Sequence, residues 1–396
     1  MKIARIIARL NVGGPARQAI LLTQRMNAAG HPSLLLAGQV PAREGNAEYL
    51  ADQAGVAIHR IRGLSREISI FSDFLAGWEI YRLLRRERPD LVHTHTAKAG
   101  LLGRIAAFCA RVPCVHTYHG HVFHGYFPPW KTRIFLLLER LLSRCSKKLI
   151  AISPLQLHEL SQVYRVAPAQ KFALVRLGFD LSSFLTIAAA RDRALQNPSG
   201  LRIGWVGRLT AIKDPALFLH FAHAFLSQNP GARFQVIGDG DLGLELRDLA
   251  RELRLGDALE FSGWLTDMPA VYSHLDMLVL TSKNEGTPVA VIEAMAAGCA
   301  VMAAGVGGVA DLMSGRPMVH DGFCVYENGI LVERRDAPAF CAAAAWLSAR
   351  PQIRHAMGAH ASRYIAAHYG QDRLVSDLLK LYASVTASSD SSAMPA

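Results

Sequence analysis

The 396-residue sequence has few cysteines and no long apolar run. Its six cysteines include no CxxC pair, which favours reduced cytosolic thiols. No stretch of about eighteen uninterrupted apolar residues occurs, so we expect no membrane-spanning helix. The chain enters an apolar, strand-like segment at Lys2 without the basic, apolar and small-residue regions of a signal peptide. We therefore expect a cytoplasmic protein.

Acidic residues are scarce relative to basic ones, and the imbalance is confined to one half of the chain. The formal net charge is +11; residues 1–180 contain 25 Lys and Arg and 11 Asp and Glu, whereas residues 181–396 contain 18 and 21. The basic surface therefore belongs to the first half. Apolar residues make up 51% and aromatic residues 8%, which excludes a disordered, collagen-like or disulfide-scaffold chain. The length suits two domains of about 180 to 200 residues each.

The basic residues of the first half are densest over 81–89 and 131–148. In the second segment, apolar residues recur at helical spacing beside Arg133, Arg140 and Arg144, which predicts a basic amphipathic helix. Such a helix either lies on anionic lipid headgroups at the inner face of the plasma membrane or packs into a core with a solvated basic face, and the sequence leaves both open. We expect no nucleic-acid partner, because the sequence has no aromatic-interleaved basic strand and no zinc or helix-turn-helix signature.

Short apolar runs of strand length alternate with helix-like segments from Lys2 to about residue 180, and a second such series begins near residue 200. This pattern predicts an α/β fold of two doubly wound, Rossmann-like parallel-sheet domains, with ligands at the C-terminal ends of the strands and in the cleft between the domains. The expected parts are a first domain over 1–185, a second over 200–365, a C-terminal helix over 366–383 that packs back on the first domain, and a disordered tail over 384–396.

The segment 281–298, TSKNEGTPVAVIEAMAAG, follows an apolar strand and contains two glutamates at the start of a predicted helix. Thr287 suits the N-cap, Pro288 the first helical position, and Gly298 the stop. The free N–H groups near Thr287 and Val289, backed by the helix dipole, would form a site for a diphosphate.

The two glutamates of this segment are Glu285, just before the helix, and Glu293, inside it. At about 1.5 Å of rise per residue, Glu293 lies roughly 9 Å along the axis from the cap. This distance allows Glu293 to accept hydrogen bonds from a ribose while Glu285 stays near a sugar. The alternative is that both glutamates are solvated residues or residues that interact with the helix dipole.

Two cations, Arg208 and Lys213, lie five residues apart after the strand-like run RIGWVGRL. They would neutralise a leaving diphosphate without a metal, or simply belong to a surface loop. Gly207 immediately precedes Arg208, which suggests a close approach of the backbone to another group.

Several motifs together resemble the retaining nucleotide-sugar glycosyltransferases of family 4, which have the GT-B fold. The resemblance covers most of the chain up to about Tyr382. It rests on the glycines Gly13 and Gly14, VGRLTAIKD (206–214), VIGDGD (236–241), FSGW (261–264), NEGTPVAVIEAMAAG (284–298), VGGVAD (306–311) and NGILV (328–332).

The resemblance implies an acceptor-binding first domain and a second domain that binds the nucleotide sugar. It implies that Arg208 and Lys213 contact the donor diphosphate, that Glu293 holds the ribose and that Glu285 addresses the sugar. Gly14 would offer its backbone amide to the phosphate. The full set expected to bind the donor is Gly13, Gly14, Gly207, Arg208, Lys213, Glu285, Gly286, Thr287, Pro288, Val289 and Glu293.

The runs HTHTAKAGLLGR (93–104) and HTYHGHVFHGYF (116–127) resemble enzymes of this family that build exopolysaccharide or lipopolysaccharide. The resemblance places the active-site histidine on His119. Lys98 and Arg104 would either meet an acceptor phosphate or lie on a helix surface.

We expect no metal and no other cofactor. The two histidine-rich runs contain no carboxylate that would complete a metal site, and Asp239 and Asp241 suit a turn better than ligation.

The expected function is transfer of a hexose-type sugar from a nucleoside diphosphate, with UDP favoured, to a carbohydrate or polyprenyl-linked acceptor in surface polysaccharide biosynthesis, with retention of anomeric configuration. The expected catalytic residues are His119, Glu285, Arg208 and Lys213. A sugar-nucleotide epimerase and a non-catalytic docking module that binds a nucleotide sugar are the alternatives.

Overall fold

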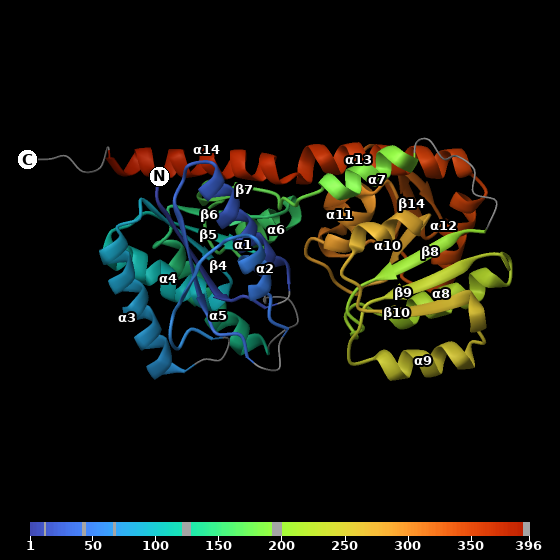
Figure 1. The fold of residues 1–396 in the computed structure, drawn as a ribbon, viewed down its shortest axis with the longest axis horizontal. Helices are drawn as coiled ribbons and strands as arrows, with labels where there is room; N and C mark the ends of the chain where they lie inside the picture. Colours follow the sequence, from blue (N-terminus) through green and yellow to red (C-terminus); the bar gives the residue numbers. More distant parts are fainter. Residues whose placement is uncertain (12, 42–44, 66–68, 121–127, 192–199, 391–396) are drawn as a thin grey trace, which may run out of the picture. The chain divides into compact units, whose positions relative to one another are not determined.

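The computed structural model describes residues 1–11, 13–41, 45–65, 69–120, 128–191 and 200–390. These form two compact units. Unit 1 consists of Met1–Gly178 together with the chain from Gln371 onward, and unit 2 consists of Phe179–Gly370. Figure 1 shows the two units and the path of the chain through them.

Unit 1 is built on a seven-stranded sheet in which every described pair of neighbouring strands is parallel. The strands are, in spatial order, β3 (Ile58–Arg60), β2 (Ser33–Gly38), β1 (Ile3–Arg9), β4 (Leu91–His95), β5 (Cys114–Tyr118), β6 (Lys148–Ala151) and β7 (Phe172–Leu174).

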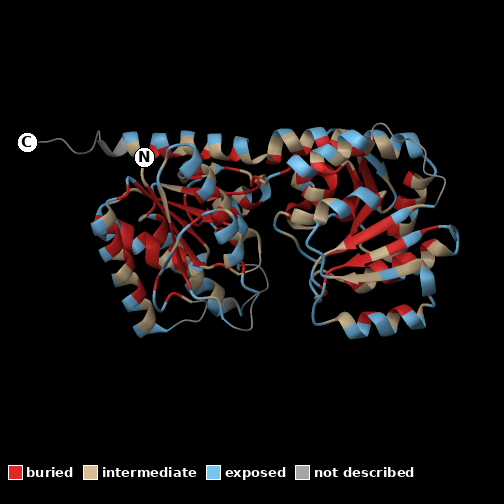
Figure 2. Ribbon diagram, in the orientation of Figure 1, coloured by how far each residue is buried: buried red, intermediate tan, exposed pale blue. Residues whose placement is uncertain are grey.

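Helices cover both faces of this sheet. They are α1 (Gly14–Ala28), α2 (Glu48–Gln53), α3 (Ile70–Glu87), α4 (Ala97–Ala110), α5 (Pro129–Ser143), α6 (Pro154–His158) and α14 (Gln371–Asp390), with a short π-helix η1 (Glu159–Val163) and a short 3₁₀-helix η2 (Ala169–Lys171). Successive strand residues point to opposite faces, so Ala4, Ile6 and Ala8 of β1 pack with α3 and α4, whereas Ile3 packs with α1 and α14. Because helices cover both faces, the inner strands are buried along most of their length, as Figure 2 shows.

Unit 2 contains an eight-stranded sheet that is parallel except at one edge, where β13, β14 and β15 pair antiparallel. In spatial order the strands are β10 (Leu259–Gly263), β9 (Arg233–Ile237), β8 (Arg202–Val206), β11 (Met277–Leu280), β12 (Ala300–Ala304), β15 (Gly329–Val332), β14 (Phe323–Tyr326) and β13 (Met318–His320).

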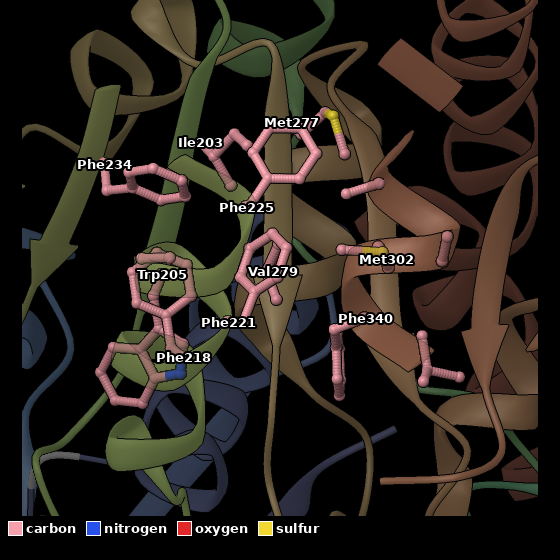
Figure 3. Packing of buried hydrophobic residues seen from close by; sticks show 14 of the residues in the cluster. Ile203, Trp205, Phe218, Phe221, Phe225, Phe234, Met277, Val279, Met302 and Phe340 are labelled. Carbon is pink, nitrogen blue, oxygen red and sulfur yellow. The ribbon is translucent and has the colours of Figure 1, made fainter. Parts of the chain in front are cut away.

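The helices of unit 2 are α7 (Ser182–Arg191), α8 (Pro215–Leu226), α9 (Gly243–Glu252), α10 (Met268–His274), α11 (Val289–Ala296), α12 (Ala337–Ser348) and α13 (Pro351–Tyr369), with turns η3 (Gly256–Ala258) and η4 (Gly307–Leu312). One face of the sheet packs against α8, α9 and α12, and the other packs against α7, α10, α11 and α13. Aromatic rings fill the first of these cores, where Phe221 lies close to Phe218, Phe234 and Phe340 (Figure 3). Such rings bury large apolar areas, which anchors the strand ends that carry the site.

Unit 1 ends at Gly178, whereas we expected the first domain to reach residue 185. The chain from Phe179 belongs to unit 2 because Phe184 of α7 is buried in its core, with its ring 5.9 Å from that of Tyr272. Unit 2 also ends later than expected, at Gly370, because α13 continues to Tyr369.

The C-terminal helix α14 packs on unit 1 through Leu374, Leu378 and Tyr382. The prediction of a disordered tail from residue 384 was wrong for the residues up to Asp390. Helix α14 continues to that residue, and Val385 is buried in the same cluster. Residues 391–396, the rest of the expected tail, lie outside the described part. No helix in the described part of the chain has the length and apolar character needed to cross a membrane.

Candidate active site

The loop after β8 carries both cations predicted to bind the donor. Gly207 donates its amide to Ile237 O at 3.0 Å, and Arg208 beside it is exposed. The backbone of Gly207 does lie close to another group, as expected, and that group is a second glycine. A Cβ atom on Gly238 would lie 1.9 Å from Gly207 O. Gly238 also has a φ of +134°, so this position requires glycine. The loops after β8 and β9 are therefore in backbone contact.

The structure brings Lys213 and Glu285 into direct contact. Lys213 Nζ lies 2.6 Å from Glu285 Oε1, and Ser282 Oγ donates to the same oxygen at 2.6 Å. Only 7% of the Glu285 side chain is exposed, against 25% of the Lys213 side chain. These residues follow β8 and β11, which are neighbouring parallel strands, so the pair lies at the C-terminal edge of the sheet. A charged pair at this edge is partly shielded from solvent, which strengthens its action on a bound anion.

Buried hydrogen bonds hold the two loops of this pair together. Trp205 Nε1 donates to Thr281 Oγ1 at 3.0 Å, and Thr281 Oγ1 donates to Asp214 O at 2.8 Å. Asp214 has a left-handed φ of +49° and accepts a hydrogen bond from Arg335 Nη1 at 2.8 Å. These hydrogen bonds between the loops were not predicted. The one residue that could have indicated them is Thr281, a polar residue directly after an apolar strand.

Helix α11 starts one residue later than expected. Pro288 occupies the N-cap position with a φ of −74° and a ψ of 107°, and the first helical residue is Val289. The assignment of Thr287 to the N-cap and of Pro288 to the first helical position was therefore wrong. The extended ψ of Pro288 excludes it from the helix. Gly298, with a φ of +74°, lies just beyond the end of the helix as predicted.

Two glycines of η4 lie against the backbone of the Glu285 loop. A Cβ on Gly307 would be 1.9 Å from Glu285 O, and a Cβ on Gly308 would be 1.9 Å from Gly286 O. The amide of Gly308 also donates to Glu285 O at 3.1 Å. The glycine pair therefore fixes the path of the loop that carries Glu285 and Gly286, a constraint that the sequence analysis did not identify.

Glu293 lies half-buried on α11 beside a tyrosine that was not predicted. Tyr272 OH is 3.3 Å from Glu293 Oε2 and 3.2 Å from Ala290 O. Burial, and then the negative charge of Glu293, raise the pKa of Tyr272 well above its usual value. Tyr272 therefore stays protonated, and its hydroxyl donates toward Glu293 Oε2, which fixes the orientation of that carboxylate.

The remaining predicted donor-binding residues belong to unit 1. Gly13 is the N-cap of α1, which begins at Gly14. A Cβ on Gly14 would meet no atom within 4 Å, so the described protein atoms leave this side of the backbone open.

His119 follows β5 and is partly buried. Its Nε2 lies 2.8 Å from Nδ1 of His95, at the end of β4. Burial lowers the pKa of His119 to about 4, so the ring is neutral at neutral pH. A neutral imidazole can donate one hydrogen bond and accept another.

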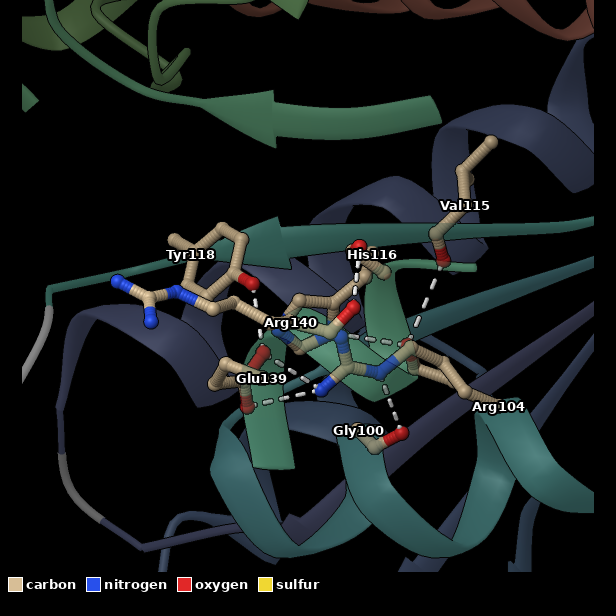
Figure 4. Close-up of polar contacts among 9 residues, drawn as sticks. Gly100, Arg104, Val115, His116, Tyr118, Glu139 and Arg140 are labelled. Carbon is tan, nitrogen blue, oxygen red and sulfur yellow. Dashed lines mark hydrogen bonds and ion pairs between the residues drawn. The ribbon is translucent and has the colours of Figure 1, made fainter. Parts of the chain in front are cut away.

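Arg104 is buried, contrary to the expectation that it lies on a surface or meets an acceptor. Its Nη2 lies 2.9 Å from each carboxylate oxygen of Glu139, and its Nε donates to Gly100 O at 2.8 Å (Figure 4). Tyr118 OH donates to Glu139 Oε2 at 2.6 Å. The prediction failed because the carboxylate of α5 neutralises an arginine of α4 inside the unit.

The other expected acceptor or membrane residues have different surroundings. Lys98 Nζ pairs with Asp73 Oδ1 at 2.5 Å, and Arg140 donates to the backbone oxygens of residues 164 and 165. Arg133 and Arg144 are exposed. Within the described residues, no group of three or more His, Cys, Asp or Glu side chains is arranged to hold a metal ion. His121 and His124 lie outside the described part.

Residues 12–183 match the family model described as Glycosyltransferase Family 4, and residues 200–350 match that described as Glycosyl transferases group 1. A UDP-Gal:alpha-D-GlcNAc-diphosphoundecaprenol alpha-1,3-galactosyltransferase of Escherichia coli is 31% identical over 292 residues, which is 72% of this chain and 74% of that protein. The chain belongs to glycosyltransferase family 4. A D-inositol 3-phosphate glycosyltransferase of Thermobispora bispora is 30% identical to this glycosyltransferase over 315 residues, or 74% of the chain and 70% of the relative.

Solved structures match this glycosyltransferase over nearly its whole length. Anabaena Alr3699/HepE in complex with UDP has a TM-score of 0.78 at 19% identity, covering 97% of this chain and 100% of that one. Sucrose-phosphate synthase of Thermosynechococcus elongatus also has a TM-score of 0.78, at 20% identity, covering 98% and 100%. The predicted GT-B fold of two Rossmann-like units is confirmed.

Proposed function

We propose that this glycosyltransferase moves a hexose-type sugar from a UDP-sugar to a carbohydrate or polyprenyl-linked acceptor in surface polysaccharide biosynthesis, retaining the anomeric configuration and needing no metal. The observation that carries the proposal is the Lys213–Glu285 pair at the C-terminal edge of the unit 2 sheet, just before the N-terminus of α11. A cation, a carboxylate and a helix N-terminus at one place suit a sugar joined to a diphosphate.

Each residue has a distinct part in the proposed reaction. Lys213, Arg208 and the first N–H groups of α11 stabilise the negative charge that grows on the diphosphate as its bond to the sugar breaks. Glu293, oriented by Tyr272, holds the ribose. Glu285 accepts hydrogen bonds from the sugar, and its bonds to Lys213 and Ser282 fix its position.

The acceptor oxygen attacks the anomeric carbon from the face that the diphosphate leaves. Its proton passes to the departing phosphate oxygen, so that no covalent enzyme intermediate is needed. The neutral ring of His119 hydrogen-bonds the sugar as positive charge develops at the anomeric carbon.

Two comparisons support the choice of donor and acceptor. The name of the Escherichia coli relative specifies UDP-Gal and a diphosphoundecaprenol-linked acceptor, and HepE has been crystallised with UDP. Basic residues at an anionic membrane surface would also suit a polyprenyl-linked acceptor.

The outer surfaces of α3 and α5 support a peripheral membrane role for unit 1. On α5, Phe135 and Leu136 pack against the core of unit 1, but Ile134, Leu137 and Leu141 are 48–58% exposed, so the described residues leave one apolar side of this helix uncovered. Phe71 and Phe74 on α3 are 75% and 69% exposed. Among the described residues of α3, α4 and α5, every exposed charged side chain is Arg or Lys. Apolar and cationic groups together suit an anionic bilayer.

The decisive experiment replaces Lys213 with alanine. We expect turnover to fall by about 100-fold or more because one stabiliser of the leaving diphosphate is lost, while the fold remains. The matched control is Lys283→Ala, an exposed lysine two residues before Glu285, which should stay within about twofold of wild type. Full activity of Lys213→Ala would contradict the assignment.

The donor is identified by thermal stability with excess UDP, GDP, ADP or dTDP, each with and without a chelator. At about a hundredfold excess over its dissociation constant, a true ligand adds about 2.7 kcal/mol, a shift of a few degrees. We expect UDP to stabilise the protein equally with and without the chelator. Isomerisation of the donor without an acceptor would indicate an epimerase, and binding without transfer a docking module.

A further inference from the structure

We propose that His95 is a positioning residue for His119: its Nδ1–H donates to Nε2 of His119 and thereby places the single proton of His119 on Nδ1. The effect of His95 on turnover rests on the proposed function of His119. The position of the proton on the His119 ring is independent of that function, because it follows from contacts within unit 1.

The ring orientation and protonation of His93, next to His95, are fixed by its hydrogen-bond partners. Arg5 Nη1 lies 2.9 Å from His93 Nδ1, and arginine only donates, so this nitrogen must accept. Tyr382 OH, from α14, lies 2.5 Å from the same atom. On the other side of the ring, Nε2 lies 2.7 Å from Thr117 Oγ1. His93 is therefore neutral, with its proton on Nε2.

His95 packs against this fixed ring. The ring centroids of His93 and His95 are 4.1 Å apart, and His95 is fully buried. Burial, above all, lowers the pKa of His95 well below its usual value. His95 therefore carries one N–H and one lone pair, and its Nδ1 lies 2.8 Å from Nε2 of His119.

The surroundings of the other nitrogen decide which ring donates. His95 Nε2 is buried and has no hydrogen-bond partner among the described residues. A cavity of about 10 Å³ adjoins His95 and His119 and is also lined by Gln18, whose Nε2 is a donor likewise without a partner in the described part. A second N–H at this place would put two unpaired donors together, and buried unpaired N–H groups are rare. The lone pair of His95 therefore lies at Nε2 and its proton at Nδ1.

This arrangement gives His119 a defined chemical role. Because Nε2 of His119 accepts from His95, the proton of the neutral ring lies on Nδ1. His119 then presents one N–H donor, which suits a sugar hydroxyl oxygen, and its Nε2 lone pair is not available to remove a proton.

The test uses the full chain labelled with ¹⁵N-histidine, with long-range ¹H–¹⁵N correlation spectra at pH 7. We expect the pattern of an Nδ1-protonated ring for His119 and of an Nε2-protonated ring for His93. An Nε2-protonated His119 in the wild-type protein would overturn the proposal, and this reading needs no variant to fold.

Variants then test the positioning. His95→Phe keeps the volume but removes the donor, so His119 should lose its Nδ1-protonated pattern. We expect kcat to fall about 10- to 100-fold, the range known for losing the outer partner of a metal-bound histidine, with KM for the donor within about twofold. His95→Asn has an amide N–H that can replace Nδ1–H, so it should restore both the Nδ1-protonated pattern of His119 and kcat.

Unchanged kcat in a folded His95→Phe variant with altered His119 tautomer would overturn the positioning role. Full activity of His119→Ala would instead refute the proposed function of His119, while the tautomer of the wild-type protein would still support the inferred hydrogen bond.

Discussion

Buried charge in this protein is stabilised by specific partners, and Arg104 is the strongest case. Its side chain is fully buried; its Nη2 donates two hydrogen bonds to Glu139 and its Nε donates one to Gly100 O. Taking two charges out of water is costly, so the pair is tolerated because each partner neutralises the other.

The first prediction concerns this pair. Glu139→Gln leaves the Arg104 charge buried without a carboxylate, and we expect a loss of about 3–5 kcal/mol in unfolding free energy by urea denaturation. The triple variant Arg104→Met, Glu139→Leu, Tyr118→Phe removes the polar set together and should recover most of that loss. Arg133→Met, on the exposed face of the same helix, should change stability by less than about 0.5 kcal/mol. A Glu139→Gln variant as stable as wild type would contradict the argument.

The sequence indicated some of the site's side-chain contacts but not others. Lys213 and Glu285 were singled out from their places after strands, and the structure joins them in an ion pair. The hydroxyl of Tyr272 beside Glu293 was not foreseeable, because the residues between these two positions, which are 21 apart, give no indication that α10 and α11 pack together. Arg104 was misassigned because burial of a charge depends on a partner 35 positions away.

At the scale of elements, the loop before α11 is shaped from outside its own sequence. The carbonyls of Glu285 and Gly286 each lie where a Cβ of the η4 glycines would be, so any side chain there displaces the loop. The helix pattern itself was readable, since a strand, a polar loop and an apolar helix ending at Gly298 were all expected. The error of one residue at Pro288 arose because proline suits both the N-cap and the first helical turn.

The second prediction uses Gly308→Ala, which puts a methyl group 1.9 Å from Gly286 O. The loop must shift, so we expect the affinity for UDP to fall about tenfold, equivalent to about 1.4 kcal/mol, in calorimetric titration. The control is Gly231→Ala, where the nearest atom would be 4.0 Å from the new carbon. Equal UDP affinity in wild type and Gly308→Ala would show that this loop does not bind the donor.

At the scale of the whole molecule, both parallel sheets and their order along the chain followed from alternating apolar runs. The positions at which the chain passes from one unit to the other could not be predicted in this way, because they depend on the core into which each helix packs. Phe184 lies close to the expected boundary, and its packing beside Tyr272 decides that α7 belongs to unit 2.

The third prediction concerns acid stability. Burial lowers the pKa values of His93, His95, His116 and His119, the last to about 4. Below the unfolded value of about 6.5 the unfolded chain binds protons that the folded chain does not, so stability falls as the pH falls from about 6.5 toward 4. Each such histidine contributes a slope of up to about 1.4 kcal/mol per pH unit.

Urea denaturation at pH 7 and pH 5.5 measures this slope. Replacing His116 with asparagine should reduce it, whereas His59→Gln, at an exposed site, should leave it unchanged. A slope that is the same in wild type and His116→Asn would contradict the prediction.

The chain leaves unit 1 at Gly178 and returns to it at Gln371, and the crossing points lie side by side: Phe179 N donates to Tyr369 O at 2.8 Å. Unit 2 is thus a continuous insertion, whereas the core of unit 1 needs Tyr382 and Leu378 from the far end of the chain. Domains usually fold in the order in which the ribosome makes them. Here the first-made unit cannot close until the last helix has been synthesised, so the second unit can complete its fold on the ribosome before the first.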